Sequence, residues 1–336
     1  MFTPCRPAAM RPAMRPAMRP AMRRAAPVAT AKLVTALLVT ARAACRGARA
    51  PPPLDDIAWQ RELEAQFTGL AAMRTGDSGP LSWTGLWSLP EGGTSIGSGP
   101  AAGIRVAGVP ALAGFFQHVG TDVLVESAPG VTLRLEDGTP VTGPMKLESD
   151  ATSRPTVLAF GELRLKVHEE PGTTRRWIRA WNPASPAIAA YRPPERFPLS
   201  RDLRLAARLT PSSTGQPIEL EDVHGGTQQF ALAGELTFTV RGGTQRLLAF
   251  RREGRDSLFV VFRDSTSGGE SYEAARYVYV PAPDKDRWTV LDFNKAHNPP
   301  CAFTAFSTCV LPPKQNRLAV PIAAGEKKPA GPPIGR

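Results

Sequence analysis

Short runs of alternating apolar and polar residues, separated by Gly and Pro, fill most of the sequence beyond its first third. The alternation is strict over 163–168 and again over 235–240. Because successive side chains of a β-strand point to opposite faces, such runs predict strands with one buried face. At least ten runs of this kind occur, and Gly161 and Gly242 stand between runs where hairpin turns or bulges are expected. The pattern predicts a mainly β protein, an antiparallel β-sandwich or barrel.

One long helix is expected before the first strand. The segment PPPLDDIAWQRELEAQFTGLAAMRTG (51–76) carries apolar residues at helical spacing, and Asp56 is placed to cap the helix. The apolar face comprises Ile57, Leu63, Phe67 and Leu70, with Trp59 out of phase. At the other end, 291–326 is rich in Pro and Asn and predicts a long C-terminal loop region.

The net charge of +11 first favours a nucleic-acid-binding protein, but its distribution argues against one. Residues 1–50 contain ten Lys and Arg and no Asp or Glu, which leaves 41 − 10 = 31 basic against 30 acidic residues in 51–336. A net charge of +1 over that region lacks the clustered basic surface that phosphate backbones require. No nucleic-acid partner is expected.

The basic excess lies in a leader that resembles a targeting segment. RPAMRPAMRPAMRR (11–24) repeats every four residues, has no apolar face and is expected to be disordered. From Met22 onward, a basic stretch, an apolar stretch and small residues ending at Cys45 follow the order of a signal peptide. Ala43-Ala44-Cys45 resembles a lipoprotein cleavage site, so Cys45 is a candidate for lipid attachment. The alternative is a start codon assigned too early, in front of a cytoplasmic protein.

The leader and the body define the expected organisation. Residues 1–50 are a disordered leader or signal peptide, 51–327 a single β-domain and 328–336 a disordered tail. No later run approaches the ~18 apolar residues of a membrane span. The expected location is therefore the periplasm or cell envelope, with membrane contact only through the leader.

Two C-terminal blocks carry the most specific sequence motifs. SLFVVFRDSTSGGESYEAARYVYV (257–280) and LDFNKAHNPPCAFTAFSTCVLPPKQNRL (291–318) resemble conserved blocks of the DUF1684 family. LSWTGLWSLPEGGTSIGSGP (81–100) and 175–211 are similar to further segments of that family. The resemblance covers about 57–327 and implies one family domain. It implies no activity, because the family is uncharacterised.

The two cysteines of the C-terminal block allow several interpretations. In an exported protein, Cys301 and Cys309 favour a disulfide that closes a small loop and contributes roughly 2–3 kcal/mol. A zinc site formed by His297 with both cysteines is an alternative, but the spacing matches no common zinc motif and no fourth ligand is evident. Two unpaired thiols or a catalytic Cys–His pair remain as further alternatives. No metal and no cofactor are expected.

Polar residues in the two C-terminal blocks suggest a cleft for a polar or anionic small molecule. Arg, Asn and Tyr on loops between strands suit such a ligand, because Arg supplies paired hydrogen-bond donors. The same residue types also cap turns and bind loop carbonyls, so a scaffolding role is the competing interpretation. The candidate residues are Arg263, Asp264, Tyr272, Arg276, Asp292, Asn294, His297, Asn298, Asn316 and Arg317.

Three functions therefore stay open from the sequence. The first is a module that binds a polar small molecule or glycan fragment between 263–276 and 292–317. The second is a hydrolase-like enzyme using Asp264 or Asp292 with His297 or Tyr272 as acid or base. The third is a structural envelope protein without a ligand. His168, on the polar side of an expected strand, is interpreted as an exposed structural histidine.

Overall fold

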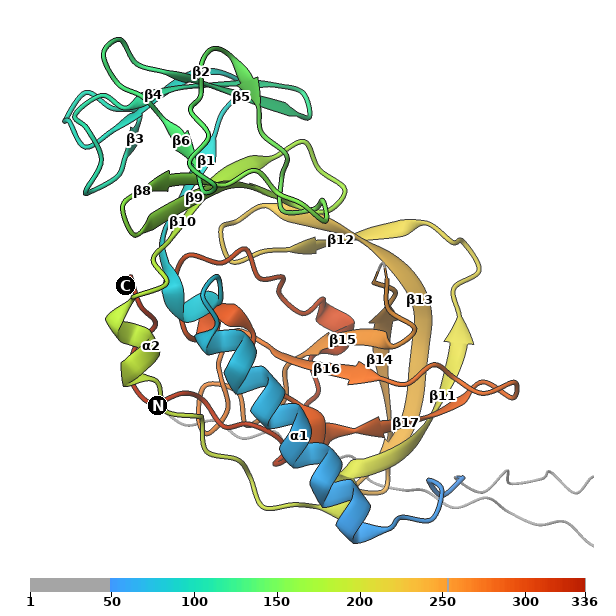
Figure 1. Ribbon diagram of the computed structural model, residues 1–336. Helices are drawn as coiled ribbons and strands as arrows, with labels where there is room; N and C mark the ends of the chain where they lie inside the picture. The colour runs from blue at the N-terminus through green and yellow to red at the C-terminus, as the bar shows by residue number, and fades with distance from the viewer. Residues whose placement is uncertain (1–48, 253, 336) are drawn as a thin grey trace, which may run out of the picture. The chain divides into compact units, whose positions relative to one another are not determined.

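The computed structural model describes residues 49–252 and 254–335, which form one compact unit (Figure 1). The predicted leader and Cys45 lie outside the described residues. Within that unit the chain is mainly β, with antiparallel pairing in every sheet and one parallel contact between β2 and β3. The expected mainly β fold with one N-terminal helix is confirmed. No helix in this part of the chain is long and apolar enough to span a membrane.

Helix α1 covers Asp56–Thr75 and begins one residue earlier than the sequence predicted. Asp55, not Asp56, is the N-cap, and its carboxylate accepts hydrogen bonds from the backbone N–H groups of Ile57 and Ala58. Trp59 is buried although it was out of phase, and Ile57 is 63% exposed. The indole N–H of Trp59 donates to Asp292 at 2.7 Å, which explains the shifted face.

Two five-stranded sheets follow α1 and pack against each other through one apolar core. The first has the order β1-β10-β9-β8-β6, and the second has the order β3-β2-β4-β5-β7. The bounds of the first are β1 Trp83–Leu89, β6 Arg134–Leu135, β8 Leu158–Phe160, β9 Leu163–Glu169 and β10 Arg176–Trp181. Those of the second are β2 Gly92–Gly97, β3 Ile104–Arg105, β4 Gly114–Val119, β5 Asp122–Ser127 and β7 Met145–Lys146. Together they form a small sandwich.

A larger, strongly curved sheet forms the C-terminal part of the fold (Figure 1). Its order is β16-β15-β14-β13-β11-β17, and β12 adds to β13. The bounds are β11 Arg204–Pro211, β12 Pro217–Glu221, β13 Thr227–Val240, β14 Gly243–Phe250, β15 Leu258–Phe262, β16 Arg276–Val280 and β17 Trp288–Asp292. Separate apolar clusters cover its two faces, so β15 is buried along its whole length.

Glycine and left-handed backbone set the turns that the sequence predicted. Gly161 has φ 58° and begins the two-residue turn between β8 and β9. Arg241 and Gly242 both have positive φ, as a type I′ turn requires, and join β13 to β14. A bulge at Gly234 bends β13, and a Cβ there would lie 2.1 Å from the Thr210 carbonyl oxygen.

The remaining segments are short helical turns and loops. A second helix, α2, covers Pro186–Ala190, and the 3-10 turns are η1 Pro80–Ser82, η2 Arg201–Leu203, η3 Phe293–Lys295, η4 Pro300–Ala302 and η5 Lys314–Asn316. No strand follows β17 in the described residues, as a C-terminal loop region requires. The sequence suggested a disordered tail over 328–336. In the structure, Ile334 accepts a hydrogen bond from Ala305 and donates one to Phe303.

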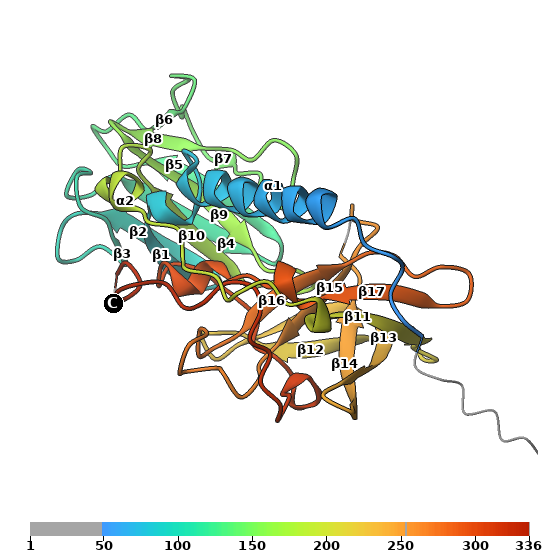
Figure 2. The same cartoon turned by 90° about the horizontal axis from the view of Figure 1, so that it is seen from below.

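Seen from below, α1 crosses the molecule in front of the strands, and the C-terminal segment runs close by (Figure 2). The contacts confirm that neighbourhood. Gln66 donates to the Lys295 carbonyl, and Arg74 forms a buried two-point ion pair with Glu326. Helix α1 is therefore fixed at its middle and at its end to the C-terminal loop region.

Candidate functional site

A cleft of about 750 Å³ opens where four parts of the described chain meet. The middle of α1 forms one wall, and β9 and β10 form a second. The curved sheet supplies an aromatic floor, and the loop 297–310 closes the remaining side. The residues that line it include Trp83, Asp150, His168, Arg179, Phe230, Arg252, Arg255, Tyr277, Tyr279, His297, Asn298, Thr308 and Cys309.

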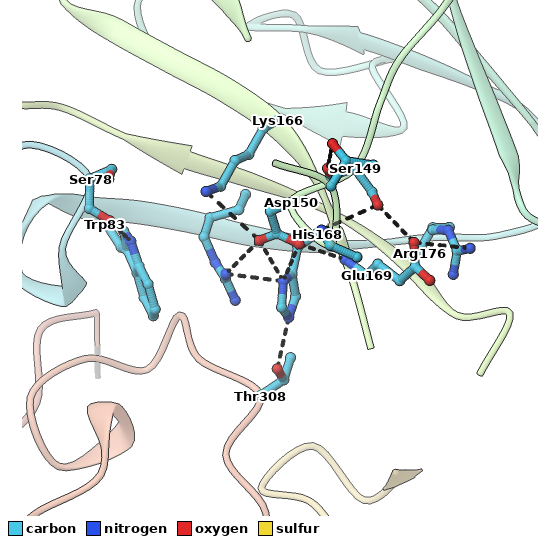
Figure 3. Close-up of polar contacts among 12 residues, drawn as sticks. Ser78, Trp83, Ser149, Asp150, Lys166, His168, Glu169, Arg176 and Thr308 are labelled. Atoms are coloured by element: carbon cyan, nitrogen blue, oxygen red, sulfur yellow. Dashed lines mark hydrogen bonds and ion pairs between the residues drawn. The ribbon is translucent and has the colours of Figure 1, made fainter. Parts of the chain in front are cut away.

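Asp150, His168 and Thr308 form a hydrogen-bonded chain in the wall of this cleft (Figure 3). The Asp150 carboxylate lies 2.9 Å from His168 Nδ1, and His168 Nε2 lies 2.9 Å from Thr308 Oγ1. His168 comes from β9, Asp150 from the loop before β8, and Thr308 from the loop between η4 and η5. The arrangement places a hydroxyl, an imidazole and a carboxylate in series.

Backbone contacts fix each member of this chain of groups. The second oxygen of Asp150 accepts the N–H of Glu169, and the Asp150 N–H donates to the Val167 carbonyl. The Thr308 carbonyl accepts from the side chain of Gln228. The Cys309 carbonyl accepts from the Val223 N–H at 3.0 Å. Neither the carboxylate nor the hydroxyl depends on a freely moving loop.

The charges around His168 keep its imidazole neutral. Burial, reinforced by the nearby Arg179 guanidinium, lowers the pKa of His168 below its usual value, although Asp150 acts in the opposite direction. For Asp150, burial raises the pKa, but His168 and Arg179 outweigh it and hold the pKa below its ordinary range. At neutral pH the pair is therefore a neutral imidazole beside a carboxylate.

Arg179 is a buried cation at the inner end of the cleft. Its guanidinium lies 4.1 Å from the ring centroid of Trp83 and 3.4 Å from an oxygen of Asp150. Burial lowers its pKa to about 10, so it stays charged at neutral pH. Its Nε atom is buried and has no hydrogen-bond partner in the described chain. One donor of this cation is therefore unsatisfied.

Arg252 and Arg255 supply two further cations on the aromatic side of the cleft. Arg252 lies over the ring of Phe259 at 5.3 Å, and Arg255 lies over the ring of Tyr279 at 5.1 Å. Across residues 49–252 and 254–335, neither guanidinium is paired with a carboxylate. Both side chains are exposed and lie against aromatic rings, so their hydrogen-bond donors remain available.

Of the ten residues proposed from the sequence, His297 and Asn298 line this cleft. The ring of His297 stacks on Tyr279, and burial lowers its pKa. Asn298 donates from its side chain to the Lys327 carbonyl, but its Oδ1 is buried without a partner in the described residues. These two side chains are the part of the predicted set that reaches the observed cleft.

The structure places the block around Arg276 in the protein core. Arg276 and Asp264 form an ion pair with no exposed side-chain surface, and Arg276 also donates to the carbonyls of Ala324 and Ile322. Tyr272 donates to the Cys301 carbonyl at 3.0 Å. These three side chains connect β16 and the loop that precedes it to the C-terminal segment.

The other predicted residues also contact the backbone or each other. Asn294 bridges Asp292 and both backbone groups of Ser200, and Asp292 accepts from Trp59. The Asn316 side chain bonds the backbone of Leu248 and Val261. Backbone hydrogen bonds join the Arg263 and Arg317 segments, and the Arg317 side chain is exposed. None of these residues is among those that line the cleft.

The predicted disulfide is corrected by the structure, in which Cys301 and Cys309 are free buried thiols. The Cys301 N–H donates to the Cys309 sulfur at 3.2 Å, so this sulfur acts as a hydrogen-bond acceptor. Burial raises the pKa of Cys309, but hydrogen bonds from Cys301 and Ser307 outweigh burial and lower it to about 7. The pKa of Cys301 is raised well above its usual value by its hydrogen bond to Cys309 and by burial.

The zinc alternative for His297, Cys301 and Cys309 finds no support in the geometry. Across the described ranges, no three His, Cys, Asp or Glu side chains gather closely enough to hold a metal ion. His297 Nδ1 contacts the Lys295 carbonyl, and the Cys309 sulfur contacts Cys301 and Ser307.

No sequence motif indicated Asp150, Thr308 or the cleft arginines as site residues, and none indicated a site role for His168. His168 was interpreted as an exposed structural histidine, but its side chain is 14% exposed and contacts Asp150 and Thr308. A histidine on the polar side of a strand, with Lys166 two residues before it, was the available signal. Its partners Asp150 and Thr308 lie 18 and 140 residues away in the sequence, so no local sequence pattern could indicate these contacts.

Comparisons with known proteins agree with the resemblance found in the sequence. Residues 189–327 match the model of a family described as "Protein of unknown function (DUF1684)". A solution NMR structure of an uncharacterized protein from Haloarcula marismortui is 29% identical, with a TM-score of 0.36. That similarity covers 42% of this chain and 80% of the other. No curated protein matches the chain. Neither description names an activity, so function is argued from the cleft.

Proposed function

We propose that this chain, whose residues 189–327 match the DUF1684 family, binds a small organic anion in the cleft beside α1. The observation that carries the proposal is the pair Arg252 and Arg255, which have aromatic neighbours and no carboxylate partner among the described residues. A guanidinium presents planar, paired donors that match a carboxylate or phosphate. Both arginines are exposed, so an anion entering the cleft would replace water as the acceptor of their hydrogen bonds.

Two residues that line the cleft each carry one buried polar atom without a partner. These are the Nε atom of Arg179 and the Oδ1 atom of Asn298, which have no hydrogen-bond partner in the described residues. A buried polar atom without a partner costs about 1–3 kcal/mol, so a ligand that reaches either atom after a shift of its side chain would be stabilised. Arg179 Nε requires an acceptor, which a carboxylate or phosphate offers. Asn298 Oδ1 requires a donor, which an additional hydroxyl group on the ligand would offer.

The floor of the cleft suits an apolar or aromatic body attached to that anion. Phe230, Tyr277 and Tyr279 line it from the curved sheet, and Leu70 and Met73 face it from α1. A volume of about 750 Å³ lies within the ordinary range of small-molecule sites. The ligand class is therefore an organic acid or phosphate with an apolar portion.

Calorimetric titration with phenylphosphonate tests the proposal, with benzyl alcohol as the neutral counterpart. Phenylphosphonate is expected to bind and benzyl alcohol is not. Because a hydrogen bond to a charged group contributes about 1.5–3 kcal/mol, Arg255→Gln is expected to weaken binding by roughly tenfold or more. Arg252→Gln should have a similar effect.

Arg251→Gln is the matched control, because Arg251 is exposed, lies next to Arg252 and does not line the cleft. This variant should bind as the wild type does. Equal affinity of wild type and Arg255→Gln for phenylphosphonate, or equal binding of both probes, would contradict the proposal.

We also propose that the protein is exported to the cell envelope, with Cys45 as the candidate site of lipid attachment. It is supported by the basic, apolar and small-residue order that ends at Cys45. Cell fractionation with radiolabelled palmitate tests it. Label in the wild type and none in Cys45→Ser is expected for a lipoprotein. A full-length, unlabelled protein in the cytoplasmic fraction would refute export.

A further inference from the structure

The aligned hydroxyl, imidazole and carboxylate in the cleft wall can perform a reaction as well as hold a ligand. We propose that Thr308, His168 and Asp150 form an acyl-transfer centre that hydrolyses a carboxylic ester whose remaining anionic group binds in this cleft. Thr308 is the nucleophile, His168 the base, and Asp150 the positioning residue. The inference rests on the proposed function for its substrate class and on separate residues for its chemistry.

The direction of the hydrogen bonds follows from the charge of Asp150. A carboxylate at 2.9 Å from His168 Nδ1 favours a proton on that nitrogen, because two lone pairs at this distance repel each other. Arg179 Nη1 can only donate and lies 3.1 Å from the same nitrogen, which favours the other tautomer. We assign the proton to Nδ1 because the carboxylate contact is the shorter of the two. Nε2 of the neutral ring is then unprotonated and accepts the Thr308 hydroxyl at 2.9 Å. Arg179 lies 3.1 Å from Nδ1 and 3.4 Å from the Asp150 carboxylate, which it helps to neutralise.

This is the protonation state that nucleophilic catalysis requires. A weakly acidic hydroxyl becomes a nucleophile when an adjacent base removes its proton during attack, and a third group orients that base. The groups facing His168 are Asp150, Arg179, Lys166 and Thr308. Burial lowers the pKa of the ring and two cations against one carboxylate reinforce it, so the ring stays neutral and ready to accept a proton at neutral pH.

The reaction balances with water as the only co-reactant. Thr308 Oγ1 attacks the ester carbonyl carbon, and its proton moves to His168 Nε2. The bond from the carbonyl carbon to the leaving oxygen breaks, and His168 returns the proton to the leaving alcohol. Water then attacks the acyl-Thr308 ester, passes a proton through His168 and releases the carboxylic acid. One ester and one water give one acid and one alcohol.

Two backbone N–H groups at the nucleophile are candidate donors for the oxyanion. In the described residues the backbone N–H groups of Thr308 and Cys309 donate to no protein acceptor, although the Thr308 and Cys309 carbonyls both accept hydrogen bonds. Donors that stay unpaired beside a nucleophile are what an oxyanion requires. A loop with fixed carbonyls and unused N–H groups is therefore compatible with acyl transfer at Thr308.

Covalent labelling tests the centre on the full-length protein. A fluorophosphonate probe phosphonylates an activated hydroxyl, with loss of fluoride and transfer of the proton to the base. Labelling of the wild type is expected, and peptide mass mapping should place the label on Thr308. A label on Cys309 or Ser307, or no label, would overturn the proposal.

Substitutions at the three positions separate catalysis from packing. Thr308→Val and His168→Gln are expected to reduce labelling and p-nitrophenyl acetate hydrolysis by about 10³-fold or more. Thr308→Ser keeps a hydroxyl and should retain both activities. Thr227→Val, at an exposed Thr on β13 outside the cleft, is the matched control and should behave as the wild type.

Asp150→Asn has a readout that packing alone would not change. Loss of the carboxylate should slow p-nitrophenyl acetate hydrolysis and move the acidic limb of its pH profile to lower pH, because His168 loses its counter-charge. An acidic limb at the wild-type position in Asp150→Asn would contradict the positioning role.

Phenylphosphonate titration distinguishes failure of this proposal from failure of the proposed function. If the wild type and Thr308→Val bind phenylphosphonate equally but neither labelling nor hydrolysis depends on Thr308, the acyl-transfer centre is refuted and the binding site stands. If labelling and hydrolysis depend on Thr308 but phenylphosphonate does not bind, the anion site is refuted and the acyl-transfer chemistry stands.

Discussion

Arg276 and Asp264 lie side by side in the core, and neither side chain has any exposed surface. Arg276 also donates to the carbonyls of Ala324 and Ile322, so one guanidinium connects β16 to the C-terminal segment. Burial lowers the pKa of Arg276, and Asp264 opposes this effect. At the scale of single residues, the Asp264 and Arg276 positions of the C-terminal block 257–280 are explained by structural contacts.

Removing one partner of this pair should therefore be costly. Arg276→Ala leaves the Asp264 charge buried and is expected to lower the free energy of unfolding by about 3–5 kcal/mol. Urea unfolding followed by tryptophan fluorescence measures this change. Arg276→Met combined with Asp264→Leu leaves no unpaired buried charge, so its free energy of unfolding should be closer to that of the wild type. A stable Arg276→Ala protein with lost phenylphosphonate binding would instead assign Arg276 to the ligand.

Residue identity also shows where sequence reasoning reaches its limit. Asn294 and Asn316 were proposed as ligand-binding residues, but their types fit a ligand and a loop carbonyl equally well, and both bond backbone carbonyls. His168 acquires its significance from Asp150 and Thr308, which only the folded chain brings within 2.9 Å. Burial and partners, and not residue type, separate the two roles.

At the scale of elements, α1 is joined to the C-terminal loop region by a buried ion pair. Arg74 and Glu326 are 2% and 4% exposed, and both guanidinium nitrogens Nη1 and Nη2 reach the carboxylate. The same carboxylate accepts the Asn298 N–H, and the guanidinium lies 4.3 Å from the ring centroid of Phe303. The pair thus fixes one wall of the cleft.

Glu326→Ala is expected to destabilise the protein by about 3–5 kcal/mol, since it leaves the Arg74 cation buried. Hydrogen exchange measured by mass spectrometry should show faster exchange at the end of α1 and in 297–310. Glu64→Ala is the matched control, because the Glu64–Arg196 pair is largely exposed and worth at most about 1 kcal/mol. Equal exchange in both variants would exclude the proposed connection.

The elements themselves were largely predictable. Alternation and glycine identified β9, β13 and their hairpin turns, because a two-fold period and positive φ leave clear signals. The start of α1 was placed one residue late, because Asp55 and Asp56 are equally good caps by type. The burial of Trp59 could not be predicted, since it depends on Asp292, which lies 233 residues away.

At the scale of the whole molecule, two buried histidines should make stability depend on pH. His168 and His297 both have pKa values below their ordinary range, mainly because of burial. The unfolded chain therefore binds protons at these sites more readily than the folded chain as pH falls through about 6.5. The free energy of unfolding should fall from pH 7 toward pH 5.

Urea unfolding at both pH values checks this expectation, with the double variant His168→Gln and His297→Gln as the comparison. The double variant should show a weaker dependence over this window. Asp150 contributes little to the change in the free energy of unfolding between pH 7 and pH 5. Its pKa is lowered in the folded chain, so the stability it contributes is lost only at more acidic pH. An unchanged dependence in the double variant would remove both histidines as its cause.

The fold class followed from the sequence, but the position of the cleft did not. The predicted cleft used two neighbouring C-terminal blocks, whereas the observed cleft combines α1, β9, β10 and the curved sheet with one of those blocks. Segments so far apart meet only through tertiary packing. The overlap is limited to His297 and Asn298. Most of the other candidates are buried by their own structural contacts, and Arg317 is exposed but does not line the cleft.

The protonation state of His168 is the most direct test of the account. The chain has four histidines, so two-dimensional ¹H–¹⁵N spectra of histidine-labelled protein can resolve each ring, with His168→Gln giving the assignment. At pH 7 the account predicts a neutral His168 ring with its proton on Nδ1, toward Asp150, and an unprotonated Nε2 facing Thr308. A charged ring, or a neutral ring with its proton on Nε2, would contradict it.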